Sequence, residues 1–160
     1  MIITLPQLSS DGWMPDFLSG YGEDMSPEMM IDDIPEAAVS MAIVMDDLDH
    51  PILPGFNHWT AWNVKPATRI PGALPKGRIV DEPIHIEQGV GYGKHCYRGP
   101  KPPFNGNHCY RFTIYALDMM LMLGFVRRRP TRHWFWRSSP TGRTRRAPRW
   151  SISSVWPLRL

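Results

Sequence analysis

Residues 110–117 read Tyr-Arg-Phe-Thr-Ile-Tyr-Ala-Leu and contain the clearest strand pattern in the chain. Apolar Phe112, Ile114 and Ala116 alternate with Arg111, Thr113 and Tyr115. This period of two is typical of a strand with one buried face. The apolar run VSMAIVM at 39–45 and the aromatic run HWTAWNV at 58–64 predict two more buried strands. These three segments predict a mainly β fold.

Short elements and turns fill the rest of the first 123 residues. The chain has 160 residues, 17 Pro and 13 Gly, which suits one domain with many connections. The opening MIITL predicts a short strand, and 66–75 and 89–107 predict loops because Gly and Pro interrupt them. Segment 84–90 is ambiguous, and 118–123 predicts either the start of a helix or the end of the preceding strand.

Several protein classes find no support in the sequence. The N-terminus lacks a basic stretch followed by an apolar run, and no apolar run reaches the roughly 18 residues that a membrane span needs. The only cysteines, Cys96 and Cys109, form no CxxC motif, which argues against a zinc site or a disulfide framework. A single bond between them is disfavoured in a reducing compartment. We therefore expect a soluble, cytoplasmic protein with no membrane span and no cofactor.

The net charge of +3 conceals two different segments. Residues 1–123 hold all 15 acidic residues and 8 of the 18 basic residues, for a net charge of −7. Residues 124–160 hold 10 Arg and neither Lys nor acid, for a net charge of +10. The two segments are therefore interpreted separately.

Polar side chains follow or begin the predicted strands at three places. Asp47 and Asp49 follow the 39–45 run, His58 begins the next strand, and His108 precedes the strand at 110. Spacing alone does not bring them together. Taken singly, Asp47 could be a turn residue, His58 a satisfied strand histidine and His108 the end of a loop.

The order of these motifs resembles the phosphatidylethanolamine-binding protein family, including its Raf-kinase-inhibitor-like bacterial branch. The matching stretches, from about residue 2 to 121, are GEDMSP at 22–27, DLDHP at 47–51, His58-Trp59 with Asn63, GPKPP at 99–103 and GNHCY at 106–110. The family signatures are roughly D-P-D-x-P, G-P-x-P-P and G-x-H-R. The resemblance implies two antiparallel sheets arranged as a β-sandwich, with short helical segments and an anion pocket at one end.

Two positions depart from the family pattern. Leu48 stands where the family usually has Pro, a change that a turn tolerates. Cys109 stands where the family usually has an Arg that supports the pocket. Arg111 does not replace it directly, because two residues further along a strand the same face lies at a different depth.

The resemblance implies that the pocket binds phosphate, a phosphoethanolamine-type head group or a similar oxyanion. The residues carried over are Asp47, His58, Gly99, Pro100 and His108, with Trp59 and Pro102 as walls. Imidazoles supply donors to such an anion, and a neighbouring Asp fixes the tautomer of a His and raises its pKa. Affinity is then expected to fall as pH rises through the histidine pKa values. A Gly-Pro loop brings backbone groups close to the ligand.

Catalysis finds less support than binding. No GxSxG, Walker, Rossmann or HExxH motif is present, and neither cysteine has an activating neighbour in the sequence. The leading hypothesis is a non-enzymatic anion-binding protein that regulates a kinase or a protease. The first alternative is a nucleic-acid-binding protein that acts through residues 124–160, and the second is a hydrolase that uses Asp47 and His58.

The segment 124–160 combines ten Arg with four Trp and four Pro. It could be a nucleic-acid-binding arm, with cations on phosphates and aromatic rings on bases, or a disordered extension. Arg without Lys or acid also matches a GC-rich gene translated out of frame. Two stretches, 133–138 and 149–153, can encode helix-like strings in another frame. We therefore predict a frameshift near residue 124, a family-like domain over 1–123 that is incomplete at its C-terminal end, and few long-range contacts for 124–160.

Overall fold

The computed structural model describes residues 1–53, 55–102 and 107–122, and the backbone of 151–158. Its one helical element is a single 3₁₀ turn, η1 (Asp16–Leu18), among these described residues. The strands are β1 (Ile2–Thr4), β2 (Met29–Asp32), β3 (Ser40–Asp47), β4 (Phe56–Val64), β5 (Arg69–Ile70), β6 (Ile79–Val80), β7 (Ile86–Gln88), β8 (Val90–Gly91), β9 (Lys94–His95), β10 (His108–Leu117) and β11 (Ser151–Leu158).

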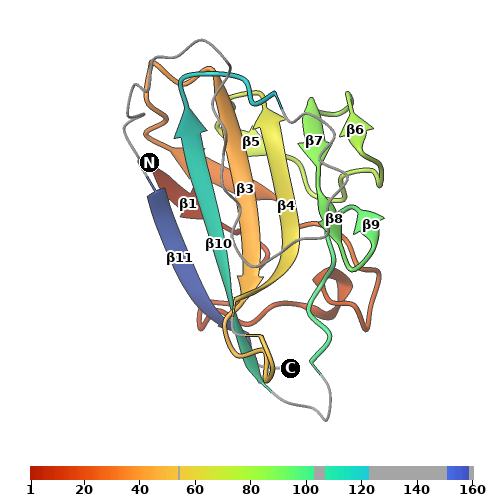
Figure 1. The fold of residues 1–160 in the computed structure, drawn as a ribbon. Helices are drawn as coiled ribbons and strands as arrows, with labels where there is room; N and C mark the ends of the chain where they lie inside the picture. The colour runs from red at the N-terminus through yellow and green to blue at the C-terminus, as the bar shows by residue number, and fades with distance from the viewer. Residues whose placement is uncertain (54, 103–106, 123–150, 159–160) are drawn as a thin grey trace.

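Two antiparallel sheets form the body of the molecule, as Figure 1 shows. The larger sheet has the order β11-β10-β3-β4-β7-β6, and the smaller has the order β1-β2-β5. β8 and β9 form a separate hairpin beside β4. The mainly β, two-sheet architecture expected from the sequence is confirmed.

The core lies between the inner faces of the two sheets. Strands β3 and β10 contribute alternate side chains, which the antiparallel register Phe112↔Met45 and Ile114↔Ile43 places opposite one another. The largest fully buried side chains of the two sheets are Met29, Ile31, Met41, Ile43, Met45, Trp59, Ile70, Ile86, Tyr110, Phe112 and Ile114. Burial of this size is the main stabilising contribution to such a fold.

The strands with the strongest patterns are where the sequence places them. The predicted segments 39–45, 58–64 and 110–117 correspond to β3, β4 and β10, each within two residues at either end. The opening strand is β1. Segment 89–107, predicted to be loop throughout, is wrong in part: it holds the β8–β9 hairpin. Its turn residues Tyr92 and Gly93 both have positive φ, which suits a two-residue hairpin turn.

The segment after β10 is neither the helix nor the strand extension considered above. Residues 118–119 form a bend, and 120–122 have no regular structure. The Asn63 side chain pairs with the backbone of this segment through two hydrogen bonds, as the backbone of a neighbouring strand would. Its Oδ1 accepts from Leu121 N at 2.7 Å, and its Nδ2 donates to Leu121 O at 3.0 Å. Residue 123 lies outside the described residues.

Part of the Arg-rich segment forms a strand that the sequence does not predict. Residues 151–158 pair antiparallel with β10 as β11, at the edge of the larger sheet, with Ser151 opposite Tyr115 and Leu158 opposite His108. The remainder, 124–150 and 159–160, lies outside the described residues. The prediction of few long-range contacts is wrong for residues 151–158, which pair with β10 along the whole length of β11. The frameshift, the domain boundary at 123 and the disorder of the remainder stay predictions. No helix of the described chain is long and apolar enough to span a membrane.

Candidate functional site

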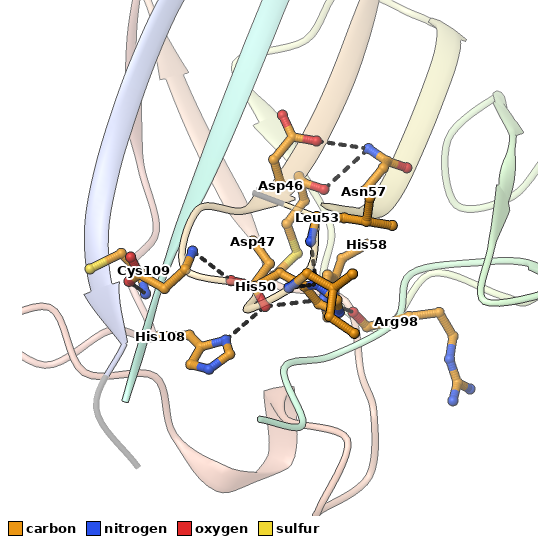
Figure 2. A network of polar contacts seen from close by, with 12 residues as sticks. Asp46, Asp47, His50, Leu53, Asn57, His58, Arg98, His108 and Cys109 are labelled. Carbon is orange, nitrogen blue, oxygen red and sulfur yellow. Dashed lines mark hydrogen bonds and ion pairs between the residues drawn. The ribbon is translucent and has the colours of Figure 1, made fainter. Parts of the chain in front are cut away.

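Asp47, at the end of β3, is the centre of a buried polar cluster that also contains His58 and His108 (Figure 2). Asp47 is 2% exposed, and its Oδ2 accepts from His108 Nδ1 at 2.8 Å. Its Oδ1 accepts from the backbone N–H of Asp49 at 3.0 Å, as in an Asx-turn. The Tyr110 hydroxyl also hydrogen-bonds to this carboxyl group. We call the side chains of Asp47, His58 and His108 the Asp47 cluster.

A β-bulge brings His58 to the cluster. The register between β3 and β4 shifts between Met45, which is opposite Trp59, and Asp46, which is opposite Asn57. His58 is the extra residue, and bulges of this kind re-aim a side chain. Both His58 and Trp59 are consequently buried, although strict alternation would put them on opposite faces.

The side chain of Asn57 holds the bulge together. Its Nδ2 lies 3.2 Å from Met45 O, 3.2 Å from Asp46 Oδ1 and 3.1 Å from Trp59 O. Figure 2 shows the Asn57 amide directed toward Asp46, away from the Asp47 carboxylate. Asn57 therefore sets the position of His58 without joining the cluster itself.

His58 is held by one ring nitrogen only. Its Nδ1 lies 2.9 Å from the carbonyl oxygen of Arg98, which only accepts, so Nδ1 carries the proton. Its Nε2 lies 3.9 Å from Asp47 Oδ2 and has no hydrogen-bond partner, although the atom is buried. Burial lowers the pKa of His58, against the opposing effects of the Arg98 carbonyl and the Asp47 charge. The sequence-based expectation of a raised pKa is therefore wrong for His58.

Aromatic rings surround the His58 imidazole. Tyr110 and Tyr92 meet it edge to face, with ring centroids at 5.0 and 5.2 Å, and Phe56 meets it at 6.0 Å. Tyr110 is buried, whereas Tyr92 is 54% exposed. Burial and the Asp47 charge raise the pKa of both tyrosines, so their hydroxyls stay protonated and can donate.

Segment 98–102 lies beside His58 and is fastened to the loop after η1. Asp24 binds it through two bonds, from Gly99 N at 2.6 Å and from Arg98 Nη1 at 2.8 Å. Gly20 N donates to Pro100 O at 2.8 Å, and the Tyr21 hydroxyl donates to Pro102 O. The position of the Arg98 carbonyl, and with it the His58 tautomer, depends on these bonds.

The structure brings together part of the predicted site. Asp47, His58 and His108 converge from three adjacent strands, and the segment holding Gly99 and Pro100 lies next to His58 through Arg98. Trp59 is a core residue: it is fully buried, donates to Gln88 Oε1 at 2.9 Å and packs edge to face on Tyr97. The rings against His58 are instead Phe56, Tyr92 and Tyr110. Pro102 is buried, and its carbonyl accepts from Tyr21.

Three residues that position the cluster were not identified from the sequence. Asn57 and Tyr92 lie outside the quoted motifs, and their roles depend on a bulge and a hairpin turn. Asp24 lies within GEDMSP, where an acidic residue before Ser-Pro was the available clue. Within the described ranges, no group of three or more His, Cys, Asp or Glu could hold a metal ion.

We expect acid to destabilise the fold through His58. Its pKa is below 6.5 in the folded state, so between that value and 6.5 the unfolded chain binds more protons. The contribution of neutral His58 to the free energy of unfolding is therefore fully present above about pH 6.5 and is lost as the pH falls toward the folded-state pKa. Urea denaturation at pH 7.5 and pH 5 is expected to show this loss, and His58→Gln to show less of it. Equal loss in both proteins would contradict the assignment, and His85→Gln, at an exposed Asp81-paired site, is the control.

Comparisons with known proteins agree with the fold and identify relatives. The model of the family described as phosphatidylethanolamine-binding protein matches residues 4–144, which continues beyond residue 123. A UPF0098 protein of Archaeoglobus fulgidus is 42% identical over 106 residues, 66% of this chain and 36% of the relative. UPF0098 protein PH1269 of Pyrococcus horikoshii is 44% identical over 104 residues, 64% of this chain and 52% of the relative.

A solved structure has the same architecture. The phosphatidylethanolamine-binding protein homologue CT736 of Chlamydia trachomatis superposes with a TM-score of 0.64 at 27% identity. The superposition covers 76% of this chain and 78% of that chain. This chain spans only about one third to two thirds of the length of the first curated relatives.

Proposed function

Because the chain belongs to the phosphatidylethanolamine-binding protein family, we propose that the Asp47 cluster binds a phosphate-type anion, such as a phosphoethanolamine head group, without catalysing its turnover. The observation that supports this most is the convergence of two imidazoles on one buried carboxylate. The bond from His108 Nδ1 to Asp47 fixes the tautomer and leaves His108 Nε2 on the far side of the ring. That nitrogen can donate to an anion when the ring is charged.

The groups around the cluster suit a small anion with a polar head. The hydroxyl of Tyr92 stays protonated and can donate. The Arg98 side chain is directed away from the cluster and is paired with Asp24 at 2.8 Å, so it is not a free donor. Hydrogen bonds from a charged imidazolium to phosphate contribute more than hydrogen bonds between neutral groups. His58 on β4 and His108 on β10, once protonated, and Tyr92 in the β8–β9 turn therefore offer donors to one ligand.

The hydrolase alternative receives less support from the geometry. It would need Asp47 to orient His58 as a base. Asp47 Oδ2 instead accepts from His108 at 2.8 Å, and His58 Nδ1 is bound to the Arg98 carbonyl. Asp47 is thus placed to orient His108, while His58 faces it at 3.9 Å through an unpartnered nitrogen.

We expect His108→Ala to weaken binding of phosphoethanolamine by about 10- to 100-fold. The variant removes a charge-assisted donor worth about 1.5–3 kcal/mol, which corresponds to that factor. Isothermal titration calorimetry at pH 6.5 measures the effect. Cys109→Ala, next along β10, is expected to change affinity less, and His85→Ala not at all. Wild-type affinity in His108→Ala would refute the proposed site.

A regulatory role toward a protein kinase or a protease is the finer form of this proposal, and it rests on the family resemblance alone. If the anion site mediates it, His108→Ala should abolish inhibition of a susceptible kinase while His85→Ala retains it. Inhibition that persists in His108→Ala would separate the two roles. Nucleic-acid binding through 124–160 concerns residues largely outside the described part of the chain.

A further inference from the structure

The buried Nε2 of His58 is a polar atom for which the ligand-free cluster supplies no partner. His58 is 3% exposed, and its Nδ1 is committed to the Arg98 carbonyl. In this tautomer Nε2 is an acceptor, and it faces a second acceptor, Asp47 Oδ2, across 3.9 Å. Two acceptors face one another without a proton between them.

The charges facing His58 do not favour the entry of a multiply charged anion. From β3, Asp47 and Asp46 contribute negative charge, and from the following loop His50 contributes an imidazole. From β10 and from the β8–β9 turn, Tyr110 and Tyr92 present hydroxyls that stay protonated. The nearby guanidinium of Arg98 is paired with Asp24 at 2.8 Å. A dianion would therefore meet the Asp47 carboxylate with little fixed positive charge to offset it.

Building on the proposed anion site, we propose that each phosphoryl ligand binds together with one proton, which is taken up by Nε2 of His58. The proton comes from solvent, and no other bond forms or breaks. The resulting imidazolium donates Nδ1–H to the Arg98 carbonyl and Nε2–H to a ligand oxygen. The Asp47 carboxylate beside it stabilises the positive charge.

The ligand reaches Nε2 after a covering side chain has moved, because this atom is buried in the ligand-free cluster. Of the rings around His58, Tyr92 is exposed and lies on a two-residue turn, so it has room to swing outward. Phe56 is half-buried and Tyr110 is 1% exposed. The same movement opens Nε2 to solvent and to the ligand, so uptake of the proton is coupled to occupation of the site.

The proton is counted by calorimetry at pH 8 in two buffers with different ionisation enthalpies. The probes are phosphoethanolamine, inorganic sulfate and glycerophosphoethanolamine. At this pH the phosphoryl group of phosphoethanolamine is mostly doubly deprotonated, while sulfate and the phosphodiester group carry no proton that titrates near neutral pH. The ethanolamine ammonium is the same in phosphoethanolamine and in the diester. We expect proton uptake with each probe that binds, about one proton more in the wild type than in His58→Gln, and about a tenfold loss of affinity per pH unit for each proton taken up. The diester arm separates a lipid-type head group from free phosphate as the source of the ligand.

Each outcome decides the question. Binding of all probes without proton uptake overturns this inference but leaves the anion site intact, whereas no binding of any probe overturns the proposed function and the inference together. Uptake with phosphoethanolamine alone would place the proton on the ligand and refute its assignment to His58. Uptake that is undiminished in His58→Gln would refute it as well. If that variant fails to fold, the ¹⁵N resonance of His58 Nε2 in the wild type, with and without sulfate, shows the protonation directly.

Discussion

Replacing Asp47 by alanine is expected to lower the free energy of unfolding by about 3–5 kcal/mol, because it removes a buried carboxylate that accepts hydrogen bonds from several donors. The His108 Nδ1–H, the Asp49 N–H and the Tyr110 hydroxyl would lose their shared acceptor. Each polar group left unsatisfied costs about 1–3 kcal/mol. Urea denaturation followed by circular dichroism measures the difference.

Asp46→Ala is the matched control, since Asp46 is the preceding residue of the same strand. Its carboxylate contacts the Asn57 amide at 3.2 Å and lies 3.6 Å from Arg111, at a half-buried position. We expect it to cost about 1 kcal/mol. Similar costs for the two variants would show that Asp47 is not the centre of the cluster.

Asp47→Asn separates stability from binding. Its amide keeps one carbonyl oxygen as acceptor, and an NH₂ group in the place of Oδ2 can donate to the unpartnered His58 Nε2. His108, whose Nδ1 meets the same position, then takes its other tautomer. We expect it to be more stable than Asp47→Ala and yet to lose the proton-coupled anion binding, because the charge that stabilises an imidazolium is gone. Calorimetry with phosphoethanolamine in two buffers tests this.

The elements that could be predicted from the sequence are those whose own side chains record their environment. β10 alternates because its inner residues face the core. β3 shows no alternation, because residues 41–45 are all hydrophobic and the polar residues Ser40 and Asp47 are buried as well. Strands of two residues, such as β5 and β6, cannot show a period. Their existence follows from partners such as β2 and β7, which local sequence does not specify.

The position of His58 shows why the site is harder to predict than the fold. Alternation along β4 would put His58 and Trp59 on opposite faces, and only the bulge at His58 turns both inward. The motif match supplied Asp47, His58 and His108. It also assigned Trp59 to the wall of the pocket, whereas the Trp59 side chain lies in the hydrophobic core. Register shifts arise from pairing between strands, so a pattern within one strand does not contain them.

Gly99 was predicted to keep backbone groups near a ligand, and its surroundings indicate another role. A Cβ at this position would lie 2.4 Å from Leu18 O, 2.7 Å from Ser19 C and 2.8 Å from Gly20 N. All three are backbone atoms, which a rotamer change cannot move. Glycine is therefore needed here for the close approach of two chain segments.

Gly99→Ala is consequently expected to cost about 3 kcal/mol of stability, which combines overpacking with lost hydrogen bonds. Separating the two segments would stretch the bonds from Gly99 N to Asp24 and from Gly20 N to Pro100 O. The Arg98 carbonyl would then shift away from His58, so affinity for phosphoethanolamine should fall as well. Urea denaturation and calorimetry measure the two effects.

Gly93→Ala provides the comparison for this last prediction. Gly93 has a φ of +77° and no atom within 4 Å of an added Cβ, so alanine there meets backbone strain without overpacking. The expected cost is about 1 kcal/mol. If Gly99→Ala were no more destabilising than Gly93→Ala, the two segments would have to separate freely. In that case the bonds of Asp24 would not position the Arg98 carbonyl, and His58 would not owe its tautomer to them.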